Sequence, residues 1–174
     1  MRIVILVAAC LAFLTGCEST VDTKIGAFAP AIAGVDINAE PVHLHRLKGK
    51  IVVIYFWTNS CCGDNVKQLE PLYQRYSHDR FAMVAIAGLC SKEEVAAYAK
   101  KHAITFTMLA DEGAGMSRQY QVLGFPTVFI LDSNGIIREK ILGAVRTETL
   151  QKLVDRQFRI RKAVDAGHDK ANPR

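Results

Sequence analysis

The 174-residue sequence contains no apolar run long enough to cross a bilayer as a helix. Residues 3–14 form an uninterrupted apolar run. A membrane-spanning helix needs about 20 such residues, so this shorter run suits the core of a signal peptide. A stripe of basic residues interleaved with aromatics, typical of nucleic-acid-binding surfaces, is also missing. The chain has no internal repeat, and its length suits one globular domain with extensions at its ends. We therefore expect a small exported domain that does not bind nucleic acid.

The formal net charge of +5 is concentrated near the C-terminus. Residues 156–174 carry most of the excess lysine and arginine, so the rest of the chain is close to neutral. We interpret residues 161–174 as a basic, solvated C-terminal tail. A tail that contacts anionic lipid or nucleic acid is the alternative interpretation.

The N-terminal residues have the pattern of an export signal. Arg2 supplies a positive start, and Leu14-Thr-Gly-Cys17 follows the apolar run. This tetrapeptide resembles the lipobox of bacterial lipoproteins, which implies cleavage before Cys17 and a diacylglycerol on its sulfur. We predict a lipoprotein signal peptide at residues 1–16, and a lipid anchor with a tether at residues 17–29. An ordinary signal peptide with an incidental cysteine is the alternative.

The predicted anchor makes the mature protein a periplasmic lipoprotein of the bacterial cell envelope. In lipoproteins of double-membrane bacteria, a residue other than Asp after the anchor cysteine usually implies the outer membrane, so Glu18 favours the outer over the inner membrane. Disulfides persist outside the cytoplasm. With Cys10 removed and Cys17 lipidated, three of the five cysteines remain as thiols: Cys61, Cys62 and Cys90.

Residues 30–160 have the periodicities of one α/β domain. Residues 51–57 form an apolar run rich in β-branched and aromatic side chains, which predicts a buried central strand. A helical pattern follows to about residue 78, and Ser91 to Glu94 fits a capping box at the start of another helix. The order of elements predicts a central mixed β-sheet flanked by helices. Further strands are expected at 31–37, 41–44, 81–87, 106–109, 128–131 and 136–142, and further helices at 114–122 and from 147.

Two adjacent cysteines lie where the central strand meets the helix. Unpaired backbone N–H groups and the helix dipole stabilise an anion at such a junction, so a thiolate is favoured there. Residues 81–87 are expected to run parallel to residues 51–57, which would bring Cys90 to the same edge of the sheet. The sequence thus predicts a reactive sulfur site at this edge.

Four segments together resemble the TlpA/ResA type of thioredoxin-fold proteins, a group of membrane-anchored thiol–disulfide oxidoreductases. The matching segments are residues 48–57, Cys61 four positions after Trp57, residues 124–127 (Gly-Phe-Pro-Thr), and residues 129–135. The resemblance implies a thioredoxin-like fold, Cys61 as the nucleophile, and Pro126 as a cis-proline beside it. It also implies that Trp57, Phe125, Pro126 and Thr127 form the substrate-binding surface.

The sequence departs from this family at the redox motif. The family has Cys-x-x-Cys, whereas this chain has Cys61-Cys-Gly-Asp64, so Asp64 replaces the resolving cysteine. Repulsion by this carboxylate is expected to make Cys61 less acidic than the nucleophile of an intact motif. Asp64 also suits the first turn of a helix, which would be a purely structural role.

The missing thiol leaves open which cysteine, if any, resolves a mixed disulfide. A disulfide between neighbours Cys61 and Cys62 would be strained, because adjacent Cα atoms are about 3.8 Å apart. Cys90 is the other candidate, either as a redox partner of Cys61 or Cys62 or as a small buried loop residue.

We predict a lipid-anchored thiol–disulfide oxidoreductase that exchanges with protein thiols and disulfides of the envelope and needs no cofactor. Three alternatives remain. One is a redox-inactive binding or assembly module, and another is a Cu(I) metallochaperone that uses the three thiolates. The third is a peroxiredoxin, because Thr58-Asn-Ser-Cys61 resembles that family's Thr-x-x-Cys, although Pro126 stands where its activating arginine is expected.

Overall fold

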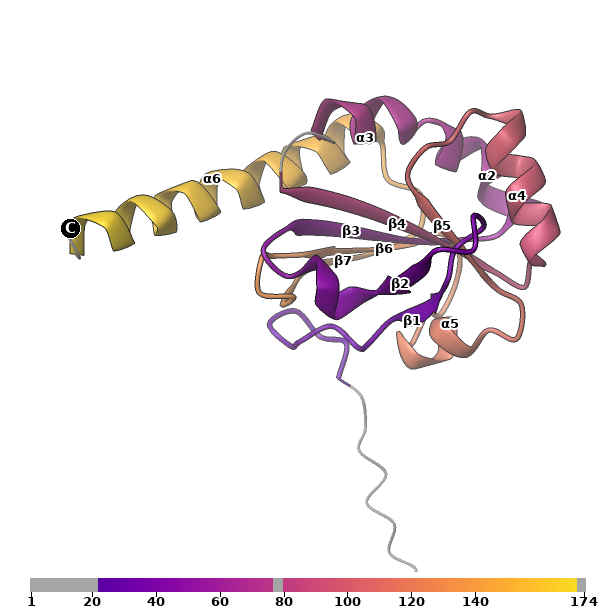
Figure 1. Cartoon of the computed structure of the whole chain (residues 1–174), viewed down its shortest axis with the longest axis horizontal. Coiled ribbons are helices and arrows are strands. Elements are labelled where there is room, and N and C mark those ends of the chain that lie inside the picture. Colours follow the sequence, from indigo (N-terminus) through magenta and orange to yellow (C-terminus); the bar gives the residue numbers. More distant parts are fainter. Residues whose placement is uncertain (1–21, 77–79, 172–174) are drawn as a thin grey trace, which may run out of the picture.

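Strand β3 (Ile51–Trp57) is the centre of the sheet, and every one of its residues is buried. The computed structural model, which describes residues 22–76 and 80–171, pairs β3 with β4 (Phe81–Gly88) in parallel and with β6 (Thr127–Leu131) antiparallel. Strands β5 (Thr107–Asp111) and β7 (Ile137–Leu142) form the edges, in the order β5-β4-β3-β6-β7 (Figure 1). The predicted mixed sheet is confirmed.

Side chains on both faces of β3 are covered, which explains why its sequence is apolar at every position. Successive side chains of a strand point to opposite faces. Val53, Tyr55 and Trp57 therefore join one core cluster, whereas Val52, Ile54 and Phe56 join the other.

Helices divide between these two faces (Figure 1). The first face is covered by α2 (Asn59–Lys67), α3 (Glu70–Tyr76), α4 (Lys92–Lys101) and α6 (Thr147–Ala171). The second is covered by α5 (Gly115–Gln119), the 3-10 helix η2 (Leu44–Leu47), and a hairpin of β1 (Ala33–Val35) and β2 (Pro41–His43).

The prediction of one helix reaching about residue 78 is wrong, because the chain forms two helices there. Helix α2 ends at Lys67 and α3 begins at Glu70, so Pro71 is the second residue of α3. Proline lacks a backbone N–H, and the first turn of a helix is where that N–H has no intrahelical partner. The helical spacing of apolar residues continues in the sequence across this break, because Val66, Leu69 and Leu72 all face the first core cluster.

Other local predictions are confirmed by the structure. Ser91 and Glu94 form the complete capping box of α4. The hairpin of β1 and β2 is antiparallel, and residues 132–136 connect β6 to β7, with Gly135 at a φ of 82°.

Both ends of the described chain extend the predicted domain. Gly26 donates a backbone hydrogen bond to Ile137, and Ala29 donates one to Gly135, so this part of the predicted tether packs on the sheet. Helix α6 continues to Ala171, through most of the predicted tail, and extends away from the sheet (Figure 1). Within residues 22–76 and 80–171, no helix has the length and apolarity to cross a membrane. The predicted signal peptide and Cys17 lie outside the described residues.

Candidate active site at the carboxyl end of the central strand

Cys61 lies in the first turn of α2, immediately after the central strand. Helix α2 starts at Asn59, two residues beyond Trp57, and Thr58 occupies its N-cap position in an extended conformation. The first N–H groups of a helix have no intrahelical partner, so they and the helix dipole favour an anion there. The backbone of Cys61 therefore occupies the predicted position for a thiolate, while its side chain lies outside the described part of the structure.

Cys62 points into the core beneath α2. It is 1 % exposed and shares the inward face of the helix with Val66. Its Sγ accepts a hydrogen bond from the Thr58 N–H at 3.4 Å and donates one to the Thr58 carbonyl at 3.5 Å.

Cys90 reaches the same place from the neighbouring parallel strand. It follows β4 by two residues, is 4 % exposed, and has its Sγ 3.8 Å from Oγ1 of Thr58. The expectation that β4 brings Cys90 to this edge of the sheet is thus confirmed. Thr58 contacts both buried sulfur atoms, a role that the sequence did not reveal.

The Phe125–Pro126 peptide bond is cis, as the resemblance implied. Thr127, the next residue, pairs with Phe56 of β3 and donates its hydroxyl to the Gly124 carbonyl at 2.6 Å. The Phe125 ring packs over Gly88, at the end of β4. The cis-proline loop is therefore attached to both strands that precede the cysteines.

Two of the predicted substrate-binding residues are buried. Trp57 is fully buried and packs on the Tyr98 ring, with 4.7 Å between the ring centroids, and Thr127 is 1 % exposed. Phe125 is partly buried and Pro126 is buried. Of these four side chains, Phe125 is the one with surface left for a substrate.

Asp64 is not in the first turn of α2, so that structural prediction is wrong. The helix begins two residues before Cys61, which places Asp64 near its middle, on the solvent side. There it accepts a hydrogen bond from Lys67 Nζ at 2.7 Å. This bond and the positive charge of Lys67 hold the pKa of Asp64 below its usual value, so the pair is present at neutral pH and is lost as the pH falls through the acidic range.

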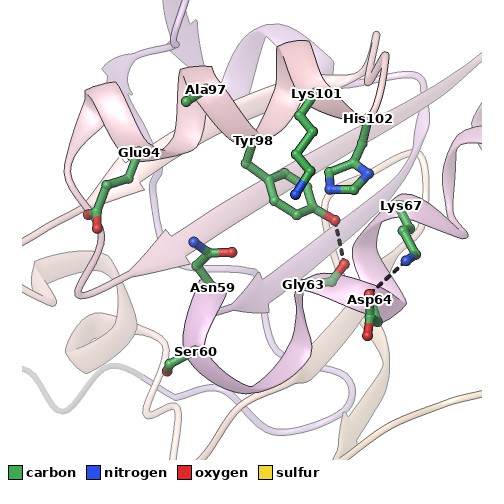
Figure 2. A pocket seen from close by; sticks show the side chains of 10 residues that line it. All are labelled: Asn59, Ser60, Gly63, Asp64, Lys67, Glu94, Ala97, Tyr98, Lys101 and His102. Carbon is green, nitrogen blue, oxygen red and sulfur yellow. Dashed lines mark hydrogen bonds and ion pairs between the residues drawn. The ribbon is translucent and has the colours of Figure 1, made fainter.

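A polar pocket of about 590 Å³ lies between α2 and α4, beside the residues that precede Cys61. Figure 2 shows Glu94 on one side of it and Lys67, Lys101 and His102 on the other. The Tyr98 hydroxyl donates a hydrogen bond to the Gly63 carbonyl and so ties the two helices together (Figure 2). Burial raises the pKa of Tyr98 to about 12, so this donor stays protonated even in mildly alkaline solution. Nothing in the sequence pattern signals this contact between helices.

Cysteines, a helix start and a cis-proline come together at this edge of the sheet. Among the described side chains, no group of three or more His, Cys, Asp or Glu could hold a metal ion. His43 and His45 contact each other, with ring centroids 5.3 Å apart.

Comparison with known proteins agrees with the fold. The sequence profile of the AhpC/TSA family matches residues 25–140, about two thirds of the chain. The chain belongs to the AhpC/TSA family. The "Thioredoxin-like protein YneN" of Bacillus subtilis (strain 168) is 28% identical over 148 residues, covering 82% of this chain and 86% of the relative. The "Thiol-disulfide oxidoreductase ResA" of a Bacillus cereus strain is 28% identical over 130 residues, covering 74% of this chain and 75% of the relative.

Solved structures of similar proteins share this architecture. The thiol:disulfide interchange protein of Chlorobium tepidum TLS has a TM-score of 0.70 at 22% identity, covering 78% of this chain and 98% of that one. At this identity the likeness concerns the fold alone. Together with the sequence relatives, it confirms the thioredoxin-like fold and the predicted TlpA/ResA-like resemblance.

We expect Gly88→Ala to disturb the cis-proline loop. A Cβ at this position would lie 2.4 Å from Cζ of Phe125, so the ring must move. Overpacking of this kind lowers the free energy of unfolding by about 1–3 kcal/mol. Urea denaturation will measure the loss. Gly113→Ala is the matched control, because an added Cβ there meets nothing within 4 Å; an equal loss in both variants would contradict the prediction.

Charges near α2 should shift the thiol pKa of Cys61 in opposite directions. Asp64→Asn should lower it and Lys67→Met should raise it, each by less than about one unit, because both side chains are exposed and solvent screens their charges. We expect the pKa in the unmodified protein to exceed about 6. Alkylation rates measured against pH will give these values, with Lys152→Met on α6 as the control. A shift above about two units for Asp64→Asn would mean that its carboxylate acts directly on the thiol.

Proposed function

We propose that this protein exchanges disulfides with proteins of the bacterial cell envelope through Cys61, while anchored to a membrane by lipid on Cys17. The family match and the relatives support a thiol–disulfide oxidoreductase of the thioredoxin superfamily. The observation that carries the proposal is the position of Cys61, in the first turn of α2 and at the sheet edge that also holds the cis-proline loop.

The exchange begins with the thiolate of Cys61. The N–H groups at the start of α2 stabilise this anion, which attacks one sulfur of a substrate disulfide. A bond forms between Cys61 and that sulfur, the substrate's S–S bond breaks, and the other substrate sulfur leaves as a thiolate and takes up a proton. The product of this step is a mixed disulfide.

The surroundings of Cys61 suit a protein substrate. Leu89 is 68% exposed and Leu123 is 88% exposed, on the loops that carry Cys90 and the cis-proline. Exposed apolar side chains at a site favour contact with an apolar segment of a partner. On another side, Asn59 and Ser60 open to the pocket between α2 and α4, which has room for polar side chains.

The sequence pattern supports location in the cell envelope. The positive start, the short apolar run and the lipobox-like tetrapeptide before Cys17 together indicate export and lipidation. Glu18 favours the outer membrane. The two acyl chains of a diacylglycerol on Cys17 would hold the domain at the membrane surface.

Replacing the nucleophile tests the proposed reaction. Cys61→Ser should reduce the rate of mixed-disulfide formation with a fluorescent peptide disulfide by at least about 100-fold, because a hydroxyl does not replace a thiolate. Ser60→Ala is the matched control and should react at nearly the original rate. Trapping by mass spectrometry will measure both. If Cys61→Ser and the unmodified protein are equally unreactive, the fold serves as a redox-inactive binding module.

Replacing the anchor tests the location. In cells of the source type, Cys17→Ser should move the protein from the membrane fraction to the soluble periplasmic fraction. Glu18→Asp is a finer variant, which should move it from the outer to the inner membrane while keeping the lipid. Density-gradient fractionation and the mass of the N-terminal peptide will show both results. A soluble wild-type protein with an unmodified Cys17 would overturn this part of the proposal.

A further inference from the structure

The two buried cysteines contact one and the same residue. Cys62 Sγ lies 3.4 Å from the Thr58 nitrogen, and Cys90 Sγ lies 3.8 Å from the Thr58 Oγ1. Both thiols belong to the same core cluster, on the face of the sheet that α2 covers. A sulfur from the helix and a sulfur from the loop after β4 thus both contact Thr58, the residue that precedes α2.

The register of α2 decides which side chain points inward. The inward face of α2 contains Cys62 and Val66, which are both 1 % exposed or less. Asp64 faces outward, and its side chain is 88% exposed where it pairs with Lys67. The position that holds the second cysteine in a Cys-x-x-Cys motif is therefore on the solvent side here, and Cys62 takes the inward position.

A strained residue precedes Cys90. Leu89 has a φ of 58°, in the left-handed region that is rare for a large side chain, and its own side chain is 68% exposed. This conformation turns the chain at the end of β4, so Leu89 faces solvent while Cys90 is buried. Ser91, which follows Cys90, is the N-cap of α4 and so fixes the end of this turn to the helix. Backbone strain of this kind persists only where the surrounding structure enforces it, and it occurs often at functional sites.

The turn that carries Cys90 is also tied to the cis-proline loop. The Phe125 ring lies so close to Gly88 that a Cβ there would be 2.4 Å from Cζ. Cys90 is therefore held between the helix that carries Cys61 and the loop that carries Pro126.

We propose that Cys62 and Cys90 are the second redox couple of this site and close to a disulfide when the protein is oxidised. This inference rests on the proposed function of Cys61. In this proposal, Cys62 and Cys90 supply the two electrons that reduce the substrate disulfide. In a Cys-x-x-Cys motif, the cysteine at position 64 would take part in supplying them.

The electrons pass through two further exchanges. Cys62 thiolate attacks Sγ of Cys61 in the mixed disulfide, so the bond to the substrate breaks and the substrate leaves as a thiolate. Cys90 thiolate then attacks Sγ of Cys62, which breaks the strained bond between neighbours and releases Cys61 as a thiolate. In sum, one substrate disulfide becomes two thiols, the thiols of Cys62 and Cys90 become one disulfide, and their two protons go to the substrate thiolates. The reverse sequence oxidises a substrate dithiol.

Peptide mapping of the oxidised full chain tests the proposal. Trypsin places Cys61 and Cys62 in the peptide of residues 51–67, and Cys90 in the peptide of residues 81–92. After oxidation with diamide and alkylation of the remaining thiols, we expect these two peptides to be linked. The link should persist in Cys61→Ser and disappear in Cys90→Ala and in Cys62→Ala. A link that is lost in Cys61→Ser, or no link in any sample, would overturn the proposal.

Kinetics separate this inference from the function of Cys61. Without Cys90, no thiol relieves the strained bond between Cys61 and Cys62, and the released peptide thiolate reopens that bond. With the fluorescent peptide disulfide, Cys90→Ala should therefore form the mixed disulfide at the normal rate, but its net release of the peptide should be at least about tenfold slower. Normal release from Cys90→Ala would refute the role of Cys90 and leave Cys61 as the nucleophile. Failure of the unmodified protein to form any mixed disulfide would instead refute the proposed function. Denaturant curves of the alanine variants will show that each is folded.

Discussion

The complete burial of β3 is the constraint on which the rest of the structure depends. Its seven apolar residues pair with strands on both sides and are covered on both faces, so the strand has no freedom to shift. Its end at Trp57 fixes where Thr58 and the start of α2 lie. Because β4 runs parallel to it and β6 enters from the same edge, Cys90 and the cis-proline loop come to this point as well. One buried strand thus gathers three segments that are far apart in the sequence.

The start of α2 at Asn59 determines which side chains of the cysteine motif face the core. A helix that begins here has Cys61 in its first turn, Cys62 on its inward face and Asp64 among solvent-exposed residues. The inward thiol is therefore Cys62, two positions before the place of the second cysteine in a Cys-x-x-Cys motif. Asp64 carries its charge away from the core and is balanced by Lys67. In the proposed mechanism, the redox chemistry therefore depends on the buried sulfurs and on the helix start.

Contacts between helices hold this arrangement in place. The Tyr98 hydroxyl bonds to the Gly63 carbonyl, and its ring packs on Trp57, so α4 supports α2 within one turn of the cysteines. Buried rings and a protonated phenol give a rigid support, because a donor in an apolar site loses much free energy when its acceptor is removed. Trp57 and Tyr98 thus support the start of α2 from its inner side.

The sequence by itself determined the central strand, the capping box of α4 and the hairpin at residues 31–44, because each depends on a local pattern. The cis-proline was implied by the resemblance of residues 124–127 to a known family. Local periodicity could not reveal the break before Pro71, since both helices bury the same face. Which cysteines meet was decided only by the tertiary structure. Cys62 and Cys90 are separated by a helix pair and a strand, and the contact of both with Thr58 depends on the register of α2 and on the turn at Leu89. The helix register and the turn arise from packing against the sheet. The spacing of residues along the chain does not predict this packing.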